Sequence, residues 1–381
     1  MKIYRNIIGL LFIATVSVNC NKGSLSVGSN ENSVDLDARY ILFDSGISTR
    51  GELITRDYLD AHFSVLGYEY PGSWDIAWEH TKPLVFDAVP QKVKFDQTTS
   101  TYSYDNPKIW SGNAYSFFAY YPDTHDNIAL FDGGEIEFGI PYITYSLPID
   151  ISESTTSTIL DPRDLVDVMT GSYIDTRISY GAEVTMLMHH RLSAIDVAVR
   201  NYYMYETDAD PEPAKIEITK LQFNPIVSNT QAAIYLDGSK TEGNGRNIEL
   251  QIPLIGNDSD LEWVLDSKEF EPNNSTKPLS LVTSDKTTTI LLIPQTEKMQ
   301  FSLEMEYKVK TGDGYIENPE PKVGQTDPYL FSHSESRSFD KSLVEGNRYN
   351  VEITFTQNAV TINITTADEW DYNEDVKHEF E

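Results

Sequence analysis

Cysteine is nearly absent from this 381-residue sequence, which holds a single one, Cys20. One cysteine excludes an intramolecular disulfide and a zinc site built from several thiolates. Basic residues are also scarce, with 29 Lys and Arg against 59 Asp and Glu and a net charge of -30. The electric field of such a chain repels a phosphate backbone. We therefore expect no nucleic acid among its partners.

The residue patterns of known catalytic sites are missing as well. The sequence has no G-x-S-x-G turn, no Walker loop, no H-E-x-x-H helix and no D-x-[DN]-x-[DN]-G calcium loop. His189 and His190 are adjacent, and neighbours on a strand point to opposite faces, so the two rings do not chelate one metal ion. The many carboxylates indicate a solubility device, with a calcium site as the alternative. We predict no catalytic residue, no metal, no cofactor and no enzymatic activity.

Helical periodicity is rare in this sequence, and the dominant period is two. Strands with one apolar face and one solvent-exposed face are typical of antiparallel sheets packed as sandwiches. The sequence therefore predicts an all-β fold, with 55–63 and 161–169 as the best short helical segments. The alternating runs lie at 136–140, 195–199, 248–254, 301–309, 351–355 and 360–364.

The first residues indicate export. Lys2 and Arg5 precede an apolar run, 7–18, that is too short to span a bilayer and has the length of a signal-peptide core. Cys20 follows, and this order resembles a bacterial lipoprotein signal, in which the cysteine is acylated and becomes the first mature residue. Asn19 stands where a small residue is usual. We predict lipidation at Cys20 and a surface-exposed protein on the outer membrane; a plain secreted protein is the alternative.

Beyond Cys20, composition and periodicity suggest two β-sandwich domains. The first strand, 38–47, runs into a loop of small and polar residues that carries Arg50, and such loops are ready protease targets. The acidic segment 206–214 is interpreted as a hairpin loop of the second domain, and as a domain boundary in the alternative. The predicted division is a signal peptide at 1–19, a flexible tether at 20–36, an N-terminal sandwich at 37–181, a C-terminal sandwich at 182–372 and an acidic tail at 373–381.

Four parts of the chain resemble the fimbrillin family of type V pili. They follow one another in the family's order along almost the whole mature chain. The parts are RYILFDSGISTRGE at 39–52, YSFFAYYPD at 115–123, MTGSY at 169–173 with MLMHHRLSAIDVAV at 186–199, and LLIPQ at 291–295 with GNRYNVEITFTQNAVTINITTADEW at 346–370.

The resemblance implies two tandem transthyretin-like β-sandwiches and a structural subunit of a pilus, or fimbria, that supports cell adhesion. It implies that an arginine-specific protease removes the first strand by cutting between Arg50 and Gly51. Other pilin subunits, of the same or related chains, are then the partners in donor-strand exchange, in which a strand of one subunit fills the groove opened in another. The donor residues implied for this chain are Val351, Ile353, Phe355, Val360, Ile362 and Ile364.

Two other classes of function compete with this interpretation. A surface glycan-binding lipoprotein of an outer-membrane uptake system is also a lipidated chain of β-domains with exposed aromatic residues. Trp74 and Trp78 lie close together in SWDIAWEH, and their exposure on one face would favour sugar stacking, whereas their burial would favour the pilus subunit. A glycan hydrolase or peptidase is the third class, and no motif supports it. As a further partner, a glycan or host ligand is compatible with an adhesive subunit.

Overall fold

The computed structural model describes residues 40–367, apart from 45–61, 71–84, 88, 97, 100, 112, 132–139, 150–156, 176–183, 206–210, 257–267, 273–278, 281–288 and 313. By its contacts the chain divides into residues 1–38 and a compact unit of residues 39–381, to which all the described residues belong. The described part consists of strands, β1 to β24, with one 3-10 turn at Pro162–Asp164. The predicted all-β class is therefore confirmed. No described helix is long and apolar enough to cross a membrane.

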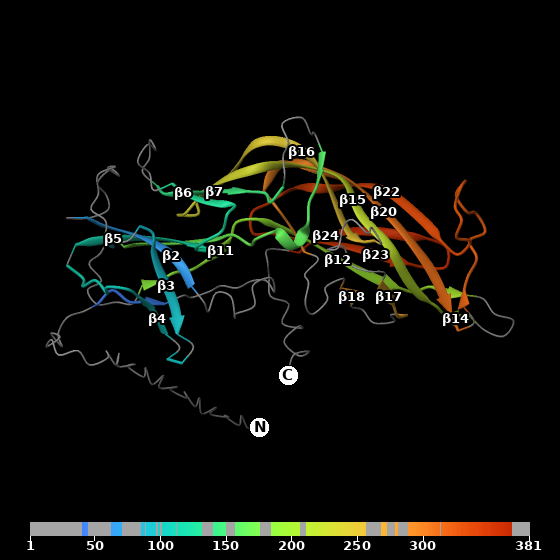
Figure 1. Cartoon of the computed structure of the whole chain (residues 1–381), viewed down its shortest axis with the longest axis horizontal. Coiled ribbons are helices and arrows are strands. Elements are labelled where there is room, and N and C mark those ends of the chain that lie inside the picture. The colour runs from blue at the N-terminus through green and yellow to red at the C-terminus, as the bar shows by residue number, and fades with distance from the viewer. Residues whose placement is uncertain are drawn as a thin grey trace, which may run out of the picture. The chain divides into compact units, whose positions relative to one another are not determined.

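Six strands from the first half of the chain form one antiparallel sheet (Figure 1). Its middle strand, β5, is buried along nearly its whole length because both of its faces are covered, so it reads as a continuous apolar run without alternation. The order is β11 (His189–His190), β9 (Met169–Asp175), β5 (Ala114–Tyr121), β2 (His62–Tyr70), β3 (Gln91–Asp96) and β4 (Thr101–Tyr104). Beside it, β1 (Phe43–Asp44) pairs in parallel with β10 (Val184–Thr185).

A nine-stranded sheet is organised around β15 (Lys215–Tyr235), which pairs with four other strands of the described chain. Figure 1 shows β15 running beside β16 and β20, and β22 beside β20. The remaining members are β16 (Thr241–Ile255), β20 (Gln295–Thr311), β22 (Phe331–Leu343), β17 (Lys268–Phe270), β21 (Gly314–Tyr315), β6 (Ile128–Phe131), β7 (Tyr142–Ser146) and β8 (Ser157–Ile159).

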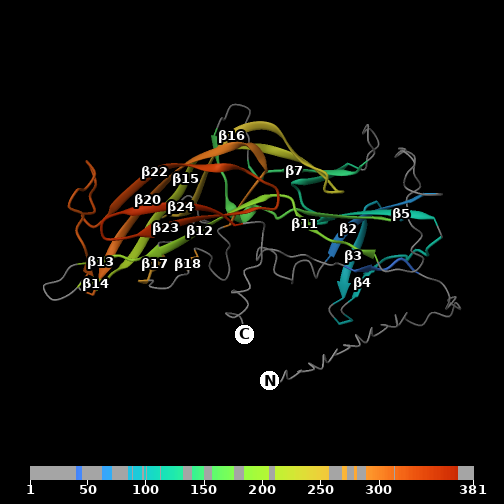
Figure 2. The same ribbon diagram turned by 180° about the vertical axis from the view of Figure 1, so that it is seen from behind.

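A five-stranded sheet contains the C-terminal hairpin. Its strand β23 (Arg348–Phe355) lies between β12 (Ser193–Asn201), to which it is parallel, and β24 (Val360–Ala367), to which it is antiparallel (Figure 2). The other two members, β18 (Leu279–Ser280) and β19 (Ile290–Leu292), both pair with β12. β13 (Met204–Tyr205) and β14 (Glu212–Pro213) pair antiparallel, so the acidic segment belongs to a hairpin as interpreted, and its place in a second domain stays a prediction.

The buried apolar side chains of the described residues form two clusters. The larger cluster takes its members mainly from β12, β15, β16, β20 and β23, where alternate residues are buried as the period of two predicts. The smaller cluster is rich in aromatic rings and includes Ile41 and Phe43 of the first strand with Phe63, Phe86 and Phe117. Alternate residues of β2 and β5 belong to different clusters, so the first sheet is covered on both faces and the clusters hold the layers together.

Local structure differs from the sequence predictions at the two helical segments. Of 55–63, residues 62 and 63 belong to β2, and the rest lie outside the described residues. In 161–169 only Pro162–Asp164 is helical, as a 3-10 turn, and Met169 already begins β9. The prediction was wrong over most of that segment because pairing of the flanking strands overrides a weak local preference. The boundary between 181 and 182 stays a prediction, and β6, β7 and β8 of the first half pair with β15 and β16 of the second.

Candidate functional site

The first strand of the described chain lies between β10 and the segment that contains Lys108 and Ile109. The Ile41 N–H donates to the Lys108 carbonyl at 2.8 Å on one side, and the Val184 N–H donates to the Leu42 carbonyl at 2.8 Å on the other. Tyr40 forms a bridge with Ile109 next to the first of these bonds. The strand therefore fills a slot whose two edges would be left without partners if it were removed.

The side chains of this strand alternate between the core and the solvent. Ile41 and Phe43 are buried, whereas Leu42 between them is 37% exposed. The Phe43 ring meets the ring of Tyr104 edge-on at 5.6 Å between centroids and that of Phe117 at 5.4 Å, with Phe86 6.1 Å away. An aromatic side chain in such a box contributes a large buried area and ring contacts of defined geometry. The Phe43 ring thus fills the space between the rings of Phe86, Tyr104 and Phe117, which we call the aromatic box.

Tyr104 forms a hydrogen bond with the backbone of the same strand. Its hydroxyl donates to the Ile41 carbonyl at 3.0 Å and accepts the Lys108 N–H at 3.0 Å. Burial raises the pKa of the Tyr104 phenol, while the N–H of Lys108 acts in the opposite direction. The phenol therefore remains a neutral donor at physiological pH. Sequence reasoning missed Tyr104 and Phe86, because nothing in their local pattern reveals a contact with a distant strand, which is 63 residues away in the bond from Tyr104 to Ile41.

The implied donor residues lie in the hairpin β23–β24. Val351, Ile353 and Phe355 of β23 are buried, as is Ile362 of β24. Strand β23 has a ladder on each side, whereas β24 pairs, among the described strands, with β23 alone. β24 is thus the strand of the hairpin that can detach by breaking a single ladder.

Other predicted sites fall outside the described residues. These are the lipidation site Cys20, the cleavage pair Arg50 and Gly51, and the tryptophans Trp74 and Trp78. In the described part, no group of three or more His, Cys, Asp or Glu side chains could hold a metal ion.

The adjacent histidines behave as their place on a strand predicts. The side chain of His189 is exposed, and that of His190 is buried with its Nδ1 2.7 Å from an Asp167 carboxylate oxygen. The two rings therefore point to opposite faces of the sheet.

The family of this chain follows from its sequence as a whole. A family described as fimbrillin-like matches residues 74–370, well over half of the chain. The chain belongs to the fimbrillin-like family. This is a family of structural proteins and not of enzymes, in agreement with the lack of catalytic motifs, and it supports the role of a pilus subunit at the cell surface. A comparison with curated protein sequences found no match.

Solved structures agree with the family at the level of the fold. A fimbrial protein from Bacteroides vulgatus ATCC 8482 superposes with a TM-score of 0.57 at 17% identity, covering 87% of this chain and 99% of that one. A candidate cell adhesion protein from Bacteroides uniformis ATCC 8492 matches over 87% of this fimbrillin-like chain and 99% of its own, at 14% identity and a TM-score of 0.45. The first likeness shows a shared fold, and the second is too distant to carry an argument.

Proposed function

We propose that this fimbrillin-like protein is a pilus subunit exported as a lipoprotein, acylated at Cys20 and carried on the outer membrane. An arginine-specific protease cuts between Arg50 and Gly51 and frees the segment that contains the first strand. A donor strand of another subunit then occupies the slot. Repetition of this exchange builds a fibre that supports adhesion.

The observation that supports exchange most directly is the way in which the first strand is held. Its side chains Ile41 and Phe43 are fully packed, so an empty slot exposes an apolar groove. Its backbone is tied by few bonds, since its ladder with β10 comprises the two pairs Phe43↔Val184 and Asp44↔Thr185. Apolar side chains at alternate positions give affinity that another strand can supply equally well. The first strand is therefore suited to replacement.

The donor in this proposal is β24 with the residues that follow it. Ile362 and Ile364 have the same two-residue spacing as Ile41 and Phe43, so both pairs direct two apolar side chains to one face of a strand. Strand β23 stays in the sheet of its own subunit, because its parallel ladder with Ala194–Asn201 of β12 remains when β24 leaves.

The test compares the wild type with Arg50→Ala. Trypsin-like protease at low dose is expected to cut the wild type after Arg50 first, and N-terminal sequencing of the product reads Gly51 as the new first residue. Ladders of subunits then grow slowly on a gel, because exchange requires both the departure of the first strand and an encounter with the donor strand of a second subunit. The Arg50→Ala protein keeps the wild-type unfolding curve and gives neither the cut nor the ladder.

Two results would contradict this function. Ladders formed by the Arg50→Ala protein would separate assembly from this cleavage. A wild-type protein that stays monomeric after a clean cut would exclude exchange through the slot and favour a non-polymerising anchor or the glycan-uptake lipoprotein.

A further inference from the structure

The nine-stranded sheet divides where the partner of β15 along one edge changes from β20 to β7, and we call this place the fork. The ladder of β15 with β20 ends at the pair Asn224↔Ser302, and on this edge the ladder with β7 begins only at Gln231↔Ser146. Pro225 follows Asn224 and has no N–H with which to continue a ladder, and a register shift spans Phe223 to Ile226 on the side of β16. The hairpin β15–β16 therefore separates from the pair β20–β22.

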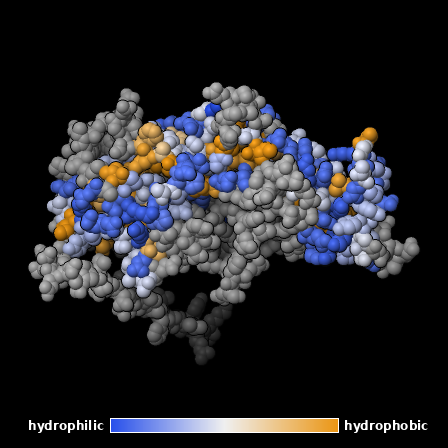
Figure 3. Space-filling view, in the orientation of Figure 1, coloured by the Kyte–Doolittle hydropathy of each residue, from blue (hydrophilic) through white to orange (hydrophobic). Residues whose placement is uncertain are grey.

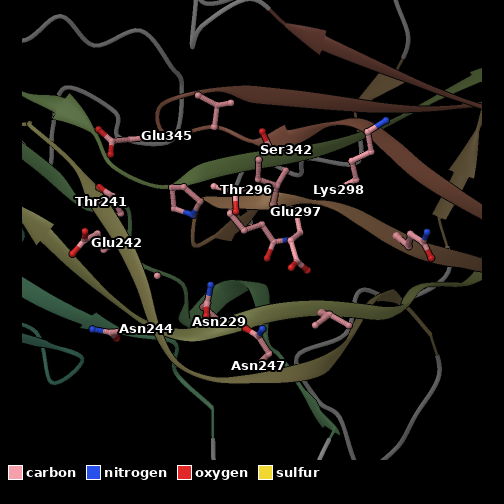
Figure 4. Close-up of a pocket in the computed structure, with 17 residues that line it drawn as sticks. Asn229, Thr241, Glu242, Asn244, Asn247, Thr296, Glu297, Lys298, Ser342 and Glu345 are labelled. Atoms are coloured by element: carbon pink, nitrogen blue, oxygen red, sulfur yellow. The ribbon is translucent and has the colours of Figure 1, made fainter.

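A cleft of about 920 Å³ lies in this fork. Figure 4 shows Asn229 and Asn247 on the wall formed by β15 and β16, with Thr296 and Glu297 on the opposite wall. Among the described lining residues, amide and hydroxyl groups are the most frequent polar groups, with three carboxylates, one ammonium group and no aromatic ring, while Val227, Pro294, Leu343 and Val344 give the cleft apolar surface as well. The polar groups that line the cleft are those of Asn229, Thr241, Glu242, Asn244, Asn247, Gln295, Thr296, Glu297, Lys298, Gln300, Ser342 and Glu345.

Two details indicate that the cleft is made to receive polar groups. The Oγ1 of Thr241 is buried in its wall and has no hydrogen-bond partner among the described atoms, although buried hydroxyls are almost always bonded. Gly243 leaves room for the Asn229 amide, whose nitrogen lies only 2.4 Å from the position that a Cβ on residue 243 would take. A side chain at 243 would displace Asn229, so the glycine maintains the amide wall.

The charges of the lining exclude two classes of ligand. Glu242 is paired with Lys240 at 2.9 Å, and Glu345 is bonded to Arg191, so two of the three carboxylates are already neutralised. The remaining Glu297 and Lys298 offer one charge of each sign. The lining therefore carries no excess charge that would select a cation or an anion, and the net charge of -30 on the chain additionally repels an anion. A neutral ligand with many donors and acceptors fits best.

An aromatic row continues from the cleft along the neighbouring strands. Lys240, bonded to Glu242, lies over the ring of Tyr235 with Nζ 4.5 Å from the ring centroid. Tyr235 packs on Tyr142 at 5.5 Å, and Tyr142 stacks on Phe131 at 5.0 Å and 7°. Phe131 is 46% exposed, and Figure 3 shows hydrophobic residues at the place of β6 and β7. Polar groups followed by two half-buried rings and the exposed ring of Phe131 suit a ligand with hydroxyl edges and apolar C–H faces.

We propose that the cleft with its aromatic row binds a neutral glycan. Asn229, Asn244 and Asn247 each donate and accept hydrogen bonds, as the vicinal hydroxyls of a sugar require. Phe131 packs on a sugar farther along the chain. This site lies apart from the slot of the first strand, so glycan binding does not depend on cleavage or assembly.

The test uses the intact, uncleaved full-length protein on an array of neutral oligosaccharides of hexoses and N-acetylhexosamines, printed beside their sialylated and sulfated forms. We expect binding to neutral members, stronger for longer ones. For the best of these, the double variant Asn244→Ala/Asn247→Ala should bind at least about tenfold more weakly, since each lost bond is worth about 1 kcal/mol and 1.4 kcal/mol is a factor of ten. Both side chains are exposed, so the variant should unfold like the wild type.

Gln251→Ala is the matched control, because Gln251 is an exposed amide on the same strand outside the cleft. Gln251→Ala should bind the oligosaccharide with the affinity of the wild type. Phe131→Ala should bind short oligosaccharides as the wild type does and should lose only the additional affinity for longer ones. Absence of binding to every neutral member, preference for the sialylated or sulfated forms, or unchanged affinity of the double variant would each overturn the proposal. None of these results bears on ladder formation, so failure here is distinguishable from failure of strand exchange.

Discussion

Asp123 illustrates how single residues hold the first sheet together. Its carboxylate lies 2.7 Å from His62 Nε2 on β2 and 2.5 Å from Lys92 Nζ on β3, and it accepts the Thr124 hydroxyl at 3.0 Å. Burial by itself raises the pKa of Asp123, but the bonds from Lys92 and Thr124 and the charge of His62 outweigh it, so the pKa is lowered below its usual 3.8. The ionised form thus ties the end of β5 to two strands.

We expect Asp123→Asn to lower the free energy of unfolding by about 1–3 kcal/mol at pH 7. A carboxyl whose folded pKa is depressed stabilises the protein above its unfolded pKa and loses this effect as the pH falls through the folded pKa. The gap between wild type and variant in urea titrations should therefore be full at pH 5–7 and shrink below about pH 3.8. A gap that stays constant down to pH 2.5 would contradict the ionic role.

Phe43 and Leu42 are neighbours on the first strand with opposite surroundings. Phe43→Ala empties the aromatic box and should cost about 3–5 kcal/mol of unfolding free energy. Leu42→Ala changes a 37% exposed side chain and should cost less than about 1 kcal/mol. Chemical denaturation of the uncleaved protein measures both, and equal losses would mean that the first strand does not plug the core.

At the scale of elements, the C-terminal hairpin contains a strand that the local sequence pattern predicts, and this strand pairs with a partner far away in the sequence. Ile353 is fully buried between Val199 of β12 and Ile362 of β24 in the register of the sheet. Ile353→Ala should lower the unfolding free energy by about 2–5 kcal/mol. The control is Asn363→Ala, on the exposed face of β24, with an expected change within about 0.5 kcal/mol. Thermal melts that do not separate the two would place the hairpin in the wrong register.

Glu352, between buried neighbours, is a poor control for this experiment. Its carboxylate pairs with Arg200 Nε at 2.8 Å across the parallel ladder. A substitution by Lys would put two positive charges opposite each other, and like charges on facing strands destabilise a sheet. The pattern of the sequence marks Glu352 as outward-facing but cannot reveal this partner.

The sequence predicted the strands with clear alternation well and their pairing poorly. The runs 195–199, 301–309 and 351–355 are strands with alternate burial, because one face of each packs on the core. By contrast, the parallel pair β12–β23 joins residues about 154 positions apart, as in Val197↔Val351, and no local signal encodes it. Strand β15 contains Pro225, which argues against a central strand in a pattern analysis, yet here it marks the fork. The cleft was missed for the same reason, since its walls come from segments that meet only in the folded sheet.

At the scale of the whole molecule, the net charge of -30 opposes assembly. Residues 1–50 carry five Lys and Arg and four Asp and Glu, so the proposed cut leaves the charge almost unchanged. Two cut subunits therefore meet against a strong like-charge repulsion, and the association step depends on how far this field extends. The Debye length is about 30 Å at 0.01 M salt and about 8 Å at 0.15 M.

Ladder formation by the cut wild type should therefore quicken several-fold between 0.01 M and 0.15 M NaCl, as followed by gel densitometry from a fixed amount of pre-cleaved subunit. The loss of the first strand is unimolecular and held by apolar contacts, so its release, measured by mass spectrometry of the freed peptide, should change little over the same range. The comparison separates encounter from strand release within one experiment. The uncut Arg50→Ala protein should give no ladder at either salt concentration. A ladder rate that falls as salt rises would instead mean that complementary patches steer the subunits together, because screening weakens attraction as it weakens repulsion.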